Sequence, residues 1–346
     1  MLGILGLLGA LFAGVVADTM VSTSHHGAAE DDPAPDELDP NDTPDQSSDG
    51  GSLLDDPNAA NDPGVGLPTS DDSTDPVDDP VNLDGSDGND VLTGNGGDDD
   101  VSGGEGNDLL GGRDGNDSID GGGGEDWEHG GTGDDTMSGA DGQDDLHGED
   151  GNDMLDGGAS NDTLSGDFGN DRLNGSANDD SLIGGDGEDT LTGGRDNDEV
   201  QGGTGSDLMA GGRGEDTVDG GDGADTIWGE GPSSGDDHTM DFLNGGTGDD
   251  LIRVGSGDYA SGGDGADQFV LDDIHQGDPV AQITDYNPHE DSLVVLYDPS
   301  QHPNPELSLD VPSGSSDATV MLDGVAVANV QGGAGLSTSD FILKAA

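Results

Sequence analysis

The sequence has no cysteine, almost no positive charge and few aromatic residues. Its 346 residues include six Lys and Arg, two Trp, three Tyr and five Phe, against 79 Asp and Glu. The absence of cysteine excludes disulfides, thiolate metal sites and cysteine nucleophiles. A hydrophobic fraction of 28% is too small for conventional cores in a chain of this length. The net charge of −73 makes nucleic acid and anionic membranes poor partners, and it opposes any compact state that binds no cations.

Two segments precede the main body of the chain. Residues 1–17 are apolar and uncharged, which is typical of an export signal or a membrane anchor, although the first Arg of the chain is Arg113. An anchor would associate the protein with a membrane. Residues 18–82 contain nine of the sixteen prolines, eighteen acidic residues and no aromatic residue. Such a segment buries too little apolar surface to fold, so we expect a disordered acidic linker.

From Gly85 onward a period of nine residues dominates, and no proline occurs between Pro80 and Pro232. A Gly stands five residues before each periodic Asp, and an apolar residue stands two residues after it, except where Glu128 takes that place. A period this long predicts a repeat architecture. The periodic residues are Asp90, Asp99, Asp108, Asp117, Asp126, Asp135, Asp144, Asp153, Asp162, Asp171, Asp180, Asp189, Asp198, Asp207, Asp216 and Asp225.

The period is interrupted by an insertion of seven residues at 231–237. It resumes with Asp241, Asp250 and Asp267, with one shortened unit at Asp258. Each unit predicts a glycine turn followed by a very short strand with one inward apolar residue. A single unit buries almost nothing, so stability has to come from stacked coils of two units each. The sequence therefore predicts a parallel solenoid with a thin aliphatic interior.

Stacking also places the acidic residues in register. Asp90, Asp108 and Asp126 fall on one edge of the solenoid, and Asp99 and Asp117 fall on the other. Carboxylates at coil spacing repel one another, so the fold needs a cation between successive turns. Flexible sites with six to eight oxygen ligands favour calcium over magnesium, whereas zinc and copper prefer His or Cys. The columns therefore predict calcium sites.

The repeat resembles the RTX, or hemolysin-type, calcium-binding nonapeptide G-G-x-G-x-D-x-U-x. Residues 184–192 match it at every place. The resemblance implies a β-roll over residues 83–270 that binds about ten to fourteen Ca²⁺ through Asp carboxylates and turn carbonyls. We expect the carboxylate ligands to be the sixteen periodic Asp residues together with Asp250 and Asp267. The resemblance also implies secretion by type I machinery and folding outside the cell.

The C-terminal segment, residues 271–346, follows a different pattern. Short apolar runs separated by Gly, Pro and Asp predict a β-rich cap on the last coil. Residues 283–286 and 291–293 resemble the module that commonly closes such rolls, and residues 340–346 resemble a C-terminal secretion signal. The expected strands are 268–271, 281–284, 293–297, 307–311, 319–322 and 325–330. The whole chain is thus expected to be all-β: a disordered linker, a parallel β-roll solenoid and a β-rich cap.

The sequence contains no recognisable catalytic domain. The HExxH motif of metalloproteases is absent. Residues 231–235 formally match G-x-S-x-G, but they lie in the insertion and lack the strand–turn–helix context of a nucleophile elbow. His129 and His147 end their repeats and are expected on the strand surface. We therefore expect a secreted, non-enzymatic calcium-binding protein that acts as a surface or matrix component, with no identifiable protein partner.

Two alternatives to this interpretation stay open. The first is a secreted toxin or hydrolase, whose activity would require Ser233 or a similar residue in an unrecognised catalytic segment. The second is a membrane-anchored adhesin, which requires residues 1–17 to stay attached. N-terminal sequencing of the cell-associated and medium fractions separates an anchored chain from a freely secreted one.

One departure from the repeat predicts a difference between the two edges. The fourth-place Gly is replaced by Ser160, Asn178 and Asp196, which are eighteen residues apart and therefore share one edge. Asn and Asp adopt left-handed backbone at modest cost and Ser less readily. In crystals grown at sub-saturating calcium, we expect lower metal occupancy on this edge between 144 and 216 than on the opposite edge between 135 and 225. Equal occupancy on both edges would contradict the prediction.

Overall fold

A computed structural model of the protein describes residues 79–231, 238–272 and 277–346. These residues belong to one compact unit of the chain, 68–346. The expected export segment at 1–17 lies outside the described residues, as does most of the linker expected at 18–82. Residues 232–237 of the insertion also lie outside them.

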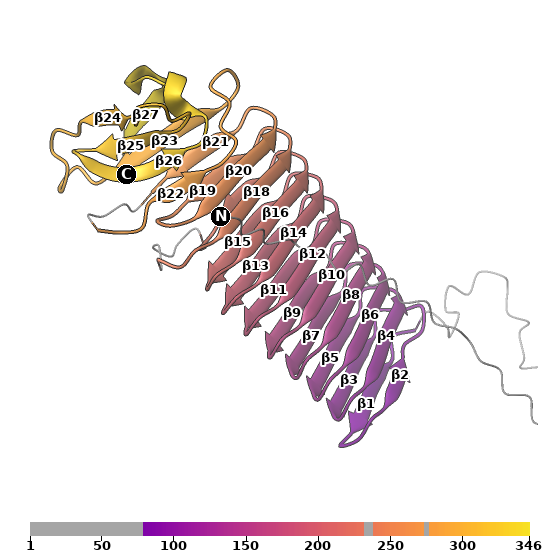
Figure 1. Ribbon diagram of the computed structural model, residues 1–346. Helices are drawn as coiled ribbons and strands as arrows, with labels where there is room; N and C mark the ends of the chain where they lie inside the picture. The colour runs from indigo at the N-terminus through magenta and orange to yellow at the C-terminus, as the bar shows by residue number, and fades with distance from the viewer. Residues whose placement is uncertain (1–78, 232–237, 273–276) are drawn as a thin grey trace, which may run out of the picture. The chain divides into compact units, whose positions relative to one another are not determined.

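The described chain winds into a solenoid of two parallel sheets, and successive strands alternate between them (Figure 1). The first sheet is built, in order, from β1 (Asn82–Ser86), β3 (Asp100–Glu105), β5 (Ser118–Gly123), β7 (Thr136–Asp141), β9 (Met154–Ala159), β11 (Arg172–Ala177), β13 (Thr190–Arg195), β15 (Leu208–Arg213), β17 (Thr226–Trp228), β19 (Leu251–Val254), β21 (Gln268–Leu271), β23 (Ser292–Tyr297) and β27 (Phe341–Ala345).

The second sheet faces the first across the interior. Its order is β2 (Val91–Thr93), β4 (Leu109–Asp114), β6 (Trp127–Thr132), β8 (Asp145–Asp150), β10 (Thr163–Phe168), β12 (Ser181–Asp186), β14 (Glu199–Thr204), β16 (Thr217–Asp222), β18 (Phe242–Thr247), β20 (Tyr259–Asp264), β22 (Ala281–Ile283), β26 (Val325–Val330), β25 (Ala318–Leu322) and β24 (Leu307–Asp310). The predicted all-β parallel solenoid is confirmed.

The strand register shows two repeats in each coil. Leu164 of β10 pairs with Leu146 of β8 and Leu182 of β12, so partners are eighteen residues apart. Most roll strands span six residues, and three residues, such as 187–189, connect one strand to the next. The strands are thus longer than the sequence pattern predicted. The first two places of each repeat, where most units have Gly, continue the preceding strand, because their backbone groups still pair with the next coil.

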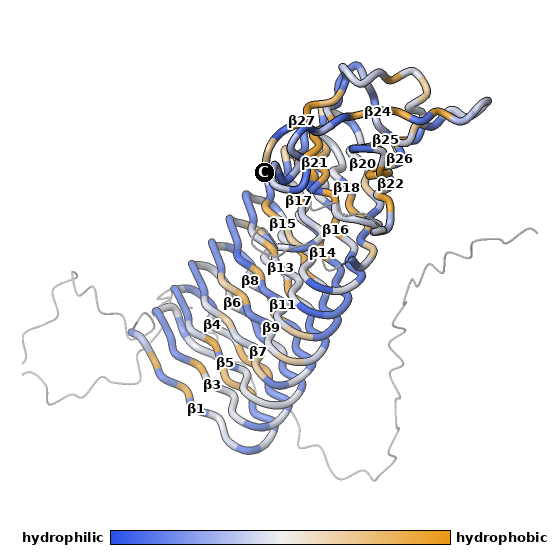
Figure 2. The backbone as a smooth tube through the Cα atoms, turned by 90° about the vertical axis from the view of Figure 1, so that its left-hand side faces the viewer, coloured by the Kyte–Doolittle hydropathy of each residue, from blue (hydrophilic) through white to orange (hydrophobic). Residues whose placement is uncertain are grey.

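The interior is a thin aliphatic layer, and the apolar residues that form it recur along the stacked coils (Figure 2). Each strand contributes its second residue, which is the eighth place of the repeat, and the residues before and after it face outward. Stacking these side chains removes apolar surface from water that no single repeat could bury. The buried members include Val101, Leu110, Ile119, Met137, Leu146, Leu155, Leu164, Leu173, Leu182, Leu191, Val200, Met209, Val218, Ile227, Leu243 and Ile252.

The backbone conformation at the fourth place of the repeat explains why glycine usually stands there. Gly187 has φ +156°, and a Cβ there would lie 1.5 Å from the carbonyl oxygen of Gly169 in the preceding coil. Where other residues replace this Gly, φ moves closer to the ordinary left-handed region: +97° at Ser160, +82° at Asn178 and +72° at Asp196. These three turns therefore keep a positive φ by shifting to values that side chains tolerate better.

The solenoid accommodates both irregular units. Thr217 of β16 pairs with Phe242 of β18, an offset of 25 residues that absorbs the seven-residue insertion. Phe242 then pairs with Tyr259 of β20, an offset of seventeen that reflects the shortened unit. The ladder of paired strands passes through both irregularities because the strand inside each unit shortens, β17 to three residues and β19 to four, and the connection that follows takes up the difference in length.

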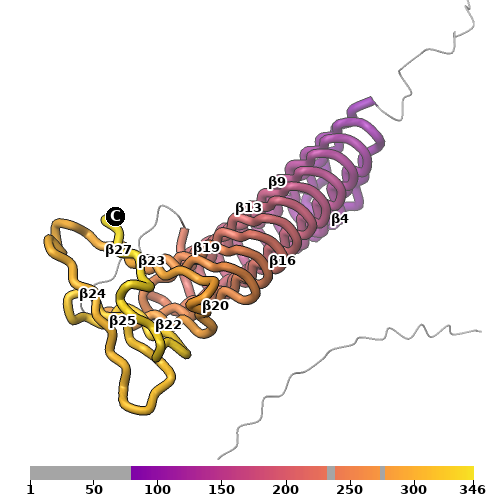
Figure 3. The backbone as a smooth tube through the Cα atoms, turned by 90° about the horizontal axis from the view of Figure 1, so that it is seen from above, coloured from indigo at the N-terminus to yellow at the C-terminus, as the bar shows by residue number. Residues whose placement is uncertain are grey.

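The C-terminal strands close the last coil (Figure 3). The strands β22, β23, β26 and β27 extend the parallel sheets, and β24, β25 and β26 form an antiparallel edge. Two short 3-10 helices, η2 (Gly333–Gly335) and η3 (Thr338–Asp340), precede β27. The predicted strand positions agree closely with these, whereas β27 was not expected as a strand. Within the described residues, no helix has the length and apolar character needed to cross a membrane.

The thin core predicts a large effect of one truncation. Leu164 is fully buried between Leu146 and Leu182, so Leu164→Ala should destabilise the calcium-loaded roll by about 2–5 kcal/mol through lost burial and a cavity. The adjacent Thr163 is exposed, and Thr163→Ala should stay within about 0.5 kcal/mol. Denaturant unfolding in saturating calcium measures both. Equal effects would contradict an interior supported by one side chain per strand.

Candidate metal sites along the two turn columns

Two ladders of aspartates follow the turns of the solenoid. Column A lies on one edge and column B on the other, and in each the backbone N–H of one Asp donates to Oδ1 of the Asp in the next coil. Examples are Asp126 to Asp144 at 2.9 Å in column A and Asp135 to Asp153 at 2.8 Å in column B. All the aspartates predicted from the sequence stand in these columns.

The membership of each column follows from this hydrogen-bond pattern. Column A is Asp90, Asp108, Asp126, Asp144, Asp162, Asp180, Asp198, Asp216, Asp241 and Asp258. Column B is Asp99, Asp117, Asp135, Asp153, Asp171, Asp189, Asp207, Asp225, Asp250 and Asp267.

The second carboxylate oxygen of most column residues is buried without a hydrogen-bond partner. A buried polar atom left in this state costs about 1–3 kcal/mol, and more when it is charged. A ladder of such atoms is therefore expected only where something else compensates them. The residues whose Oδ2 is buried and unpaired are Asp108, Asp117, Asp126, Asp135, Asp144, Asp153, Asp162, Asp171, Asp180, Asp189, Asp198, Asp207, Asp225, Asp241, Asp250 and Asp267.

The same environment raises the pKa of many column carboxyls. Burial raises the pKa of Asp135 to about 7, although the N–H of Asp117 lowers it, and the charges of Asp153 and Asp117 raise it further. Burial raises the pKa of Asp198 to about 8 for the same combination of reasons. Without a bound cation the folded roll thus resists full ionisation of its columns near neutral pH.

Each turn also presents a carbonyl oxygen toward its carboxylate. A Cβ added to Gly166 would lie 2.3 Å from Oδ2 of Asp171 and 2.6 Å from the carbonyl oxygen of Gly184 in the next coil. First-place glycines elsewhere along both columns show the same pair of neighbouring oxygens. Glycine is needed at this place because any side chain would fill the space between these oxygens.

This donor set matches a hard cation. Calcium takes carboxylate and carbonyl oxygens at about 2.3–2.6 Å in flexible geometry, and the columns supply both kinds from adjacent coils. No thiolate or imidazole stands in either column, so nothing in them favours a softer metal. The orphaned Oδ2 atoms and the spaces beside the glycines therefore fit calcium.

Three acidic residues that extend the columns were not among the predicted ligands. Asp241 and Asp258 belong to column A, but their spacings of 25 and 17 residues depart from the period. Asp291 continues column B into the cap, because its Oδ1 accepts the N–H of Asp267 at 3.1 Å. The sequence did contain a signal for these residues, which is an aspartate followed two residues later by an apolar residue. Asp291 fits this pattern because Leu293 follows it.

The irregular turn near the insertion brings three carboxylates together. Glu230, Asp241 and Asp258 each offer an oxygen within 4.8 Å of the other two. Burial, followed by the charge of Asp258, raises the pKa of Asp241 to about 9. Glu230 occupies the second place of its repeat, where most units have Gly, and so adds a carboxylate to this part of column A.

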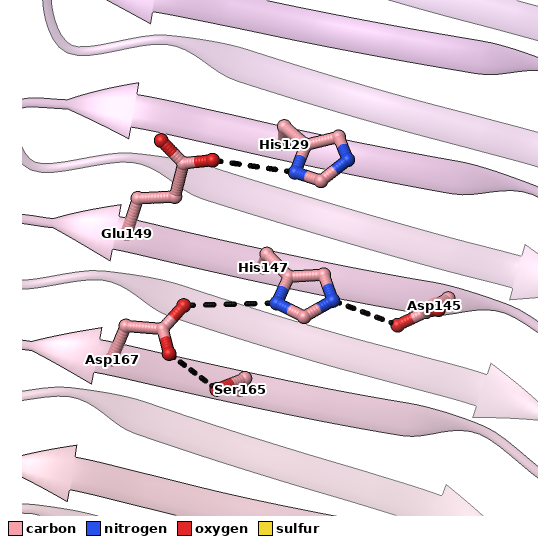
Figure 4. A network of polar contacts seen from close by, with 6 residues as sticks. All are labelled: His129, Asp145, His147, Glu149, Ser165 and Asp167. Atoms are coloured by element: carbon pink, nitrogen blue, oxygen red, sulfur yellow. Dashed lines mark hydrogen bonds and ion pairs between the residues drawn. The ribbon is translucent and has the colours of Figure 1, made fainter. Parts of the chain in front are cut away.

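A separate polar network lies on the outer face of the second sheet (Figure 4). The rings of His129 on β6 and His147 on β8 stack with centroids 5.3 Å apart. Glu149 lies 3.4 Å from Nδ1 of His129, and Asp145 lies 3.1 Å from Nε2 of His147. These side chains are partly exposed, so the ion pairs contribute little stability. Both histidines are on the strand surface and outside the columns.

The fold and these sites define a class of protein: a parallel β-solenoid whose turns carry stacked, buried carboxylates. The family model described as RTX calcium-binding nonapeptide repeat (4 copies) matches residues 82–110, 111–137, 129–164, 165–200 and 201–231. Residues 82–231 of the chain therefore belong to the RTX calcium-binding nonapeptide repeats.

Two further comparisons add little to this assignment. A search of curated proteins gave no significant match. Among solved structures, the chain is similar to a hyperactive, Ca²⁺-dependent, β-helical antifreeze protein from an Antarctic bacterium. The two share 21% identity over 67% of this chain and 89% of the other, with a TM-score of 0.34. Nothing about the function of this chain follows from that likeness.

The raised pKa values predict that the metal-free roll is more stable at acidic pH than near neutral pH. Column aspartates such as Asp162 and Asp171 have pKa values of about 7 in the fold, against 3.8 as the ordinary value. Their contribution to stability is complete below about pH 4 and is lost as pH rises through about 7. Metal-free protein should therefore show more β-structure by circular dichroism at pH 5 than at pH 8.

Calcium should reverse this trend, because it binds the ionised carboxylates and its affinity rises as protons leave. Light scattering recorded alongside the spectra is the control for association at acidic pH. A metal-free β-signal that increases from pH 5 to pH 8 would contradict the assignment of buried, uncompensated carboxylates.

Proposed function

We propose that this protein is a secreted, non-enzymatic calcium-binding protein whose roll folds when the chain meets Ca²⁺ outside the cell. In this proposal it serves as a surface or matrix scaffold component. The ligands are the aspartates of columns A and B together with turn carbonyls, and about ten to fourteen ions are bound. Residues 1–17 act as an export signal or anchor, and residues 18–82 act as a spacer.

The observation that supports this proposal best is the continuity of the buried, unpaired Oδ2 atoms. They recur from Asp108 to Asp267 along both edges. Carboxylates placed this regularly repel one another, and removing either their charge or their burial would stabilise the metal-free fold. Retaining both is reasonable only if a divalent cation binds between the turns.

The mechanism is thermodynamic linkage between metal binding and folding. A ligand that binds only the folded state at 100 times its Kd stabilises that state by about 2.7 kcal/mol for each site. Several such sites exceed the opposing repulsion when calcium is abundant and fail to do so when it is scarce. Low cytosolic calcium would keep the chain unfolded for type I export, and higher external calcium would fold it.

A non-enzymatic role agrees with the chemistry of the described residues. In the polar network of the second sheet, Ser165 Oγ donates to Oδ1 of Asp167 at 2.9 Å, and within the described residues no hydrogen bond joins that hydroxyl to His129 or His147. Ser233, the serine of the G-x-S-x-G match at 231–235, lies outside the residues that the structure describes. The proposed activity is therefore calcium-dependent assembly of a rigid rod, with no bond made or broken.

Chelation tests the proposal directly. In calcium, far-UV circular dichroism should report β-structure, and excess EDTA should convert the chain to an expanded, largely unfolded state. Magnesium at the same concentration should restore little structure, because it prefers six rigid ligands and retains its water. An unchanged β-signal after chelation would refute calcium-dependent folding.

A matched pair of variants separates column carboxylates from general acidity. Asp153 is buried in column B, whereas Asp150 is exposed three residues earlier, and replacing either by Asn removes one charge. Asp153→Asn should raise the calcium concentration at the folding midpoint about tenfold, and Asp150→Asn should leave it nearly unchanged. Equal shifts would show that only net charge matters.

A further inference from the structure

Glu128 is the one acidic residue at the inward place of the sixteen regular repeats. It lies on β6, and its register partners on β4 and β8 are Leu110 and Leu146. Its side chain is fully buried, like those of the two leucines beside it. A carboxylate therefore occupies a position that the rest of the solenoid fills with aliphatic side chains.

The carboxylate of Glu128 is poorly compensated by its surroundings. Both Oε1 and Oε2 are buried without a hydrogen-bond partner. Burial raises the pKa of Glu128 well above its usual range, and the charges of Asp144 and Asp126 raise it further, whereas the nearby N–H of Gly121 opposes this only weakly. Leucine at this place would remove the whole penalty, so a role for the charge has to be sought in what surrounds it.

The surroundings of Glu128 differ from an ordinary core site. A Cβ placed on Gly121 would lie 2.5 Å from Oε1 of Glu128, 2.6 Å from Oδ2 of Asp126 and 3.1 Å from the carbonyl oxygen of Gly139. At the equivalent Gly166, the nearest oxygens are one Asp carboxylate and one glycine carbonyl. Glu128 thus adds a third oxygen to the same space.

The side chain reaches this space from inside the solenoid. Asp126 and Asp144 are successive members of column A, and a Cβ on Gly121 would meet both Oε1 of Glu128 and Oδ2 of Asp126, which places the Glu128 carboxylate beside the turn at 121–126. Three oxygens around one small space, two of them from carboxylates, form the kind of donor set that calcium binds. Glu128 is therefore positioned toward a column site while its backbone remains in the core strand.

We propose that Glu128 is an additional, inward ligand of the calcium site formed by the turns at 121–126 and 139–144. This inference rests on the proposed calcium binding of the columns. The extra carboxylate gives this site a higher negative charge than the regular sites on either side of it. Since ligand charge tunes calcium affinity, this site fills before its regular neighbours as calcium rises.

The position of Trp127 provides a local readout. The chain has two Trp, and Trp127 lies between Asp126 and Glu128 with its side chain exposed. In a Trp228→Phe background, Trp127 is the sole indole. Terbium, which substitutes for calcium in oxygen sites, is then excited by energy transfer from Trp127 when it binds close by.

Terbium titrations of three variants in this background test the inference. Glu128→Leu restores the aliphatic side chain of the neighbouring repeats, and Glu128→Gln removes the charge at nearly constant volume. Both should raise the midpoint of Trp127-sensitised luminescence about tenfold, while saturating calcium still produces the β-signal. Glu125→Gln removes an exposed charge from the same turn and should leave the midpoint unchanged.

The outcomes are distinct. A midpoint in Glu128→Leu that equals or falls below the parent value would overturn the inference and identify Glu128 as a tolerated core acid. An equal shift in Glu125→Gln would also overturn it, because the effect would then be one of net charge. If the parent itself does not fold in response to calcium, the proposed function fails, and that result is visible before any variant is compared.

Discussion

Repulsion between stacked, buried carboxylates is the constraint on which this structure depends. In most column aspartates Oδ1 accepts a backbone N–H of the preceding coil, as Oδ1 of Asp153 does from Asp135 at 2.8 Å, and Oδ2 stays buried without a hydrogen-bond partner. The hydrogen bond fixes the position of the carboxylate, and the unpaired atom makes that position costly. The roll is thus preorganised for cations and penalised in their absence.

The hydrophobic core is matched to this arrangement. One aliphatic residue in nearly every strand, such as Leu164 or Leu182, gives a layer that runs along the solenoid but is thin across it. Such a layer can fix the register of neighbouring coils, but it offers little to oppose a net charge of −73. Packing and cation binding therefore support each other, and a change in either propagates to neighbouring coils.

The irregular units show which features the solenoid requires. Asp216 donates its N–H to Asp241 across 25 residues, and Asp241 donates to Asp258 across seventeen, yet the column stays continuous. The requirement is a turn that delivers an Asp to the correct place, whatever the length of the connection. The cap meets the same requirement through Asp291, so column B ends inside the cap.

Much of the architecture could be read from the sequence because the repeat ties each place to one physical role. A Gly at the first place leaves room for oxygens, an Asp at the sixth enters the column, and an apolar residue at the eighth enters the core. Parity then assigns each Asp to an edge, and the eighteen-residue register follows. The predicted ligands and the two columns needed no more than this local pattern.

Contacts between coils decided the rest. The six-residue strands, the strand β27 and the place of Asp291 depend on pairing partners that lie distant in sequence, so the nonapeptide pattern could not define them. Glu128 is the clearest case. The sequence marked it only as a break in the apolar pattern, whereas the fold places its carboxylate beside Asp126 and the carbonyl of Gly139. The carbonyl of Gly139 reaches this space because Gly139 stacks on Gly121, eighteen residues earlier, in the neighbouring coil.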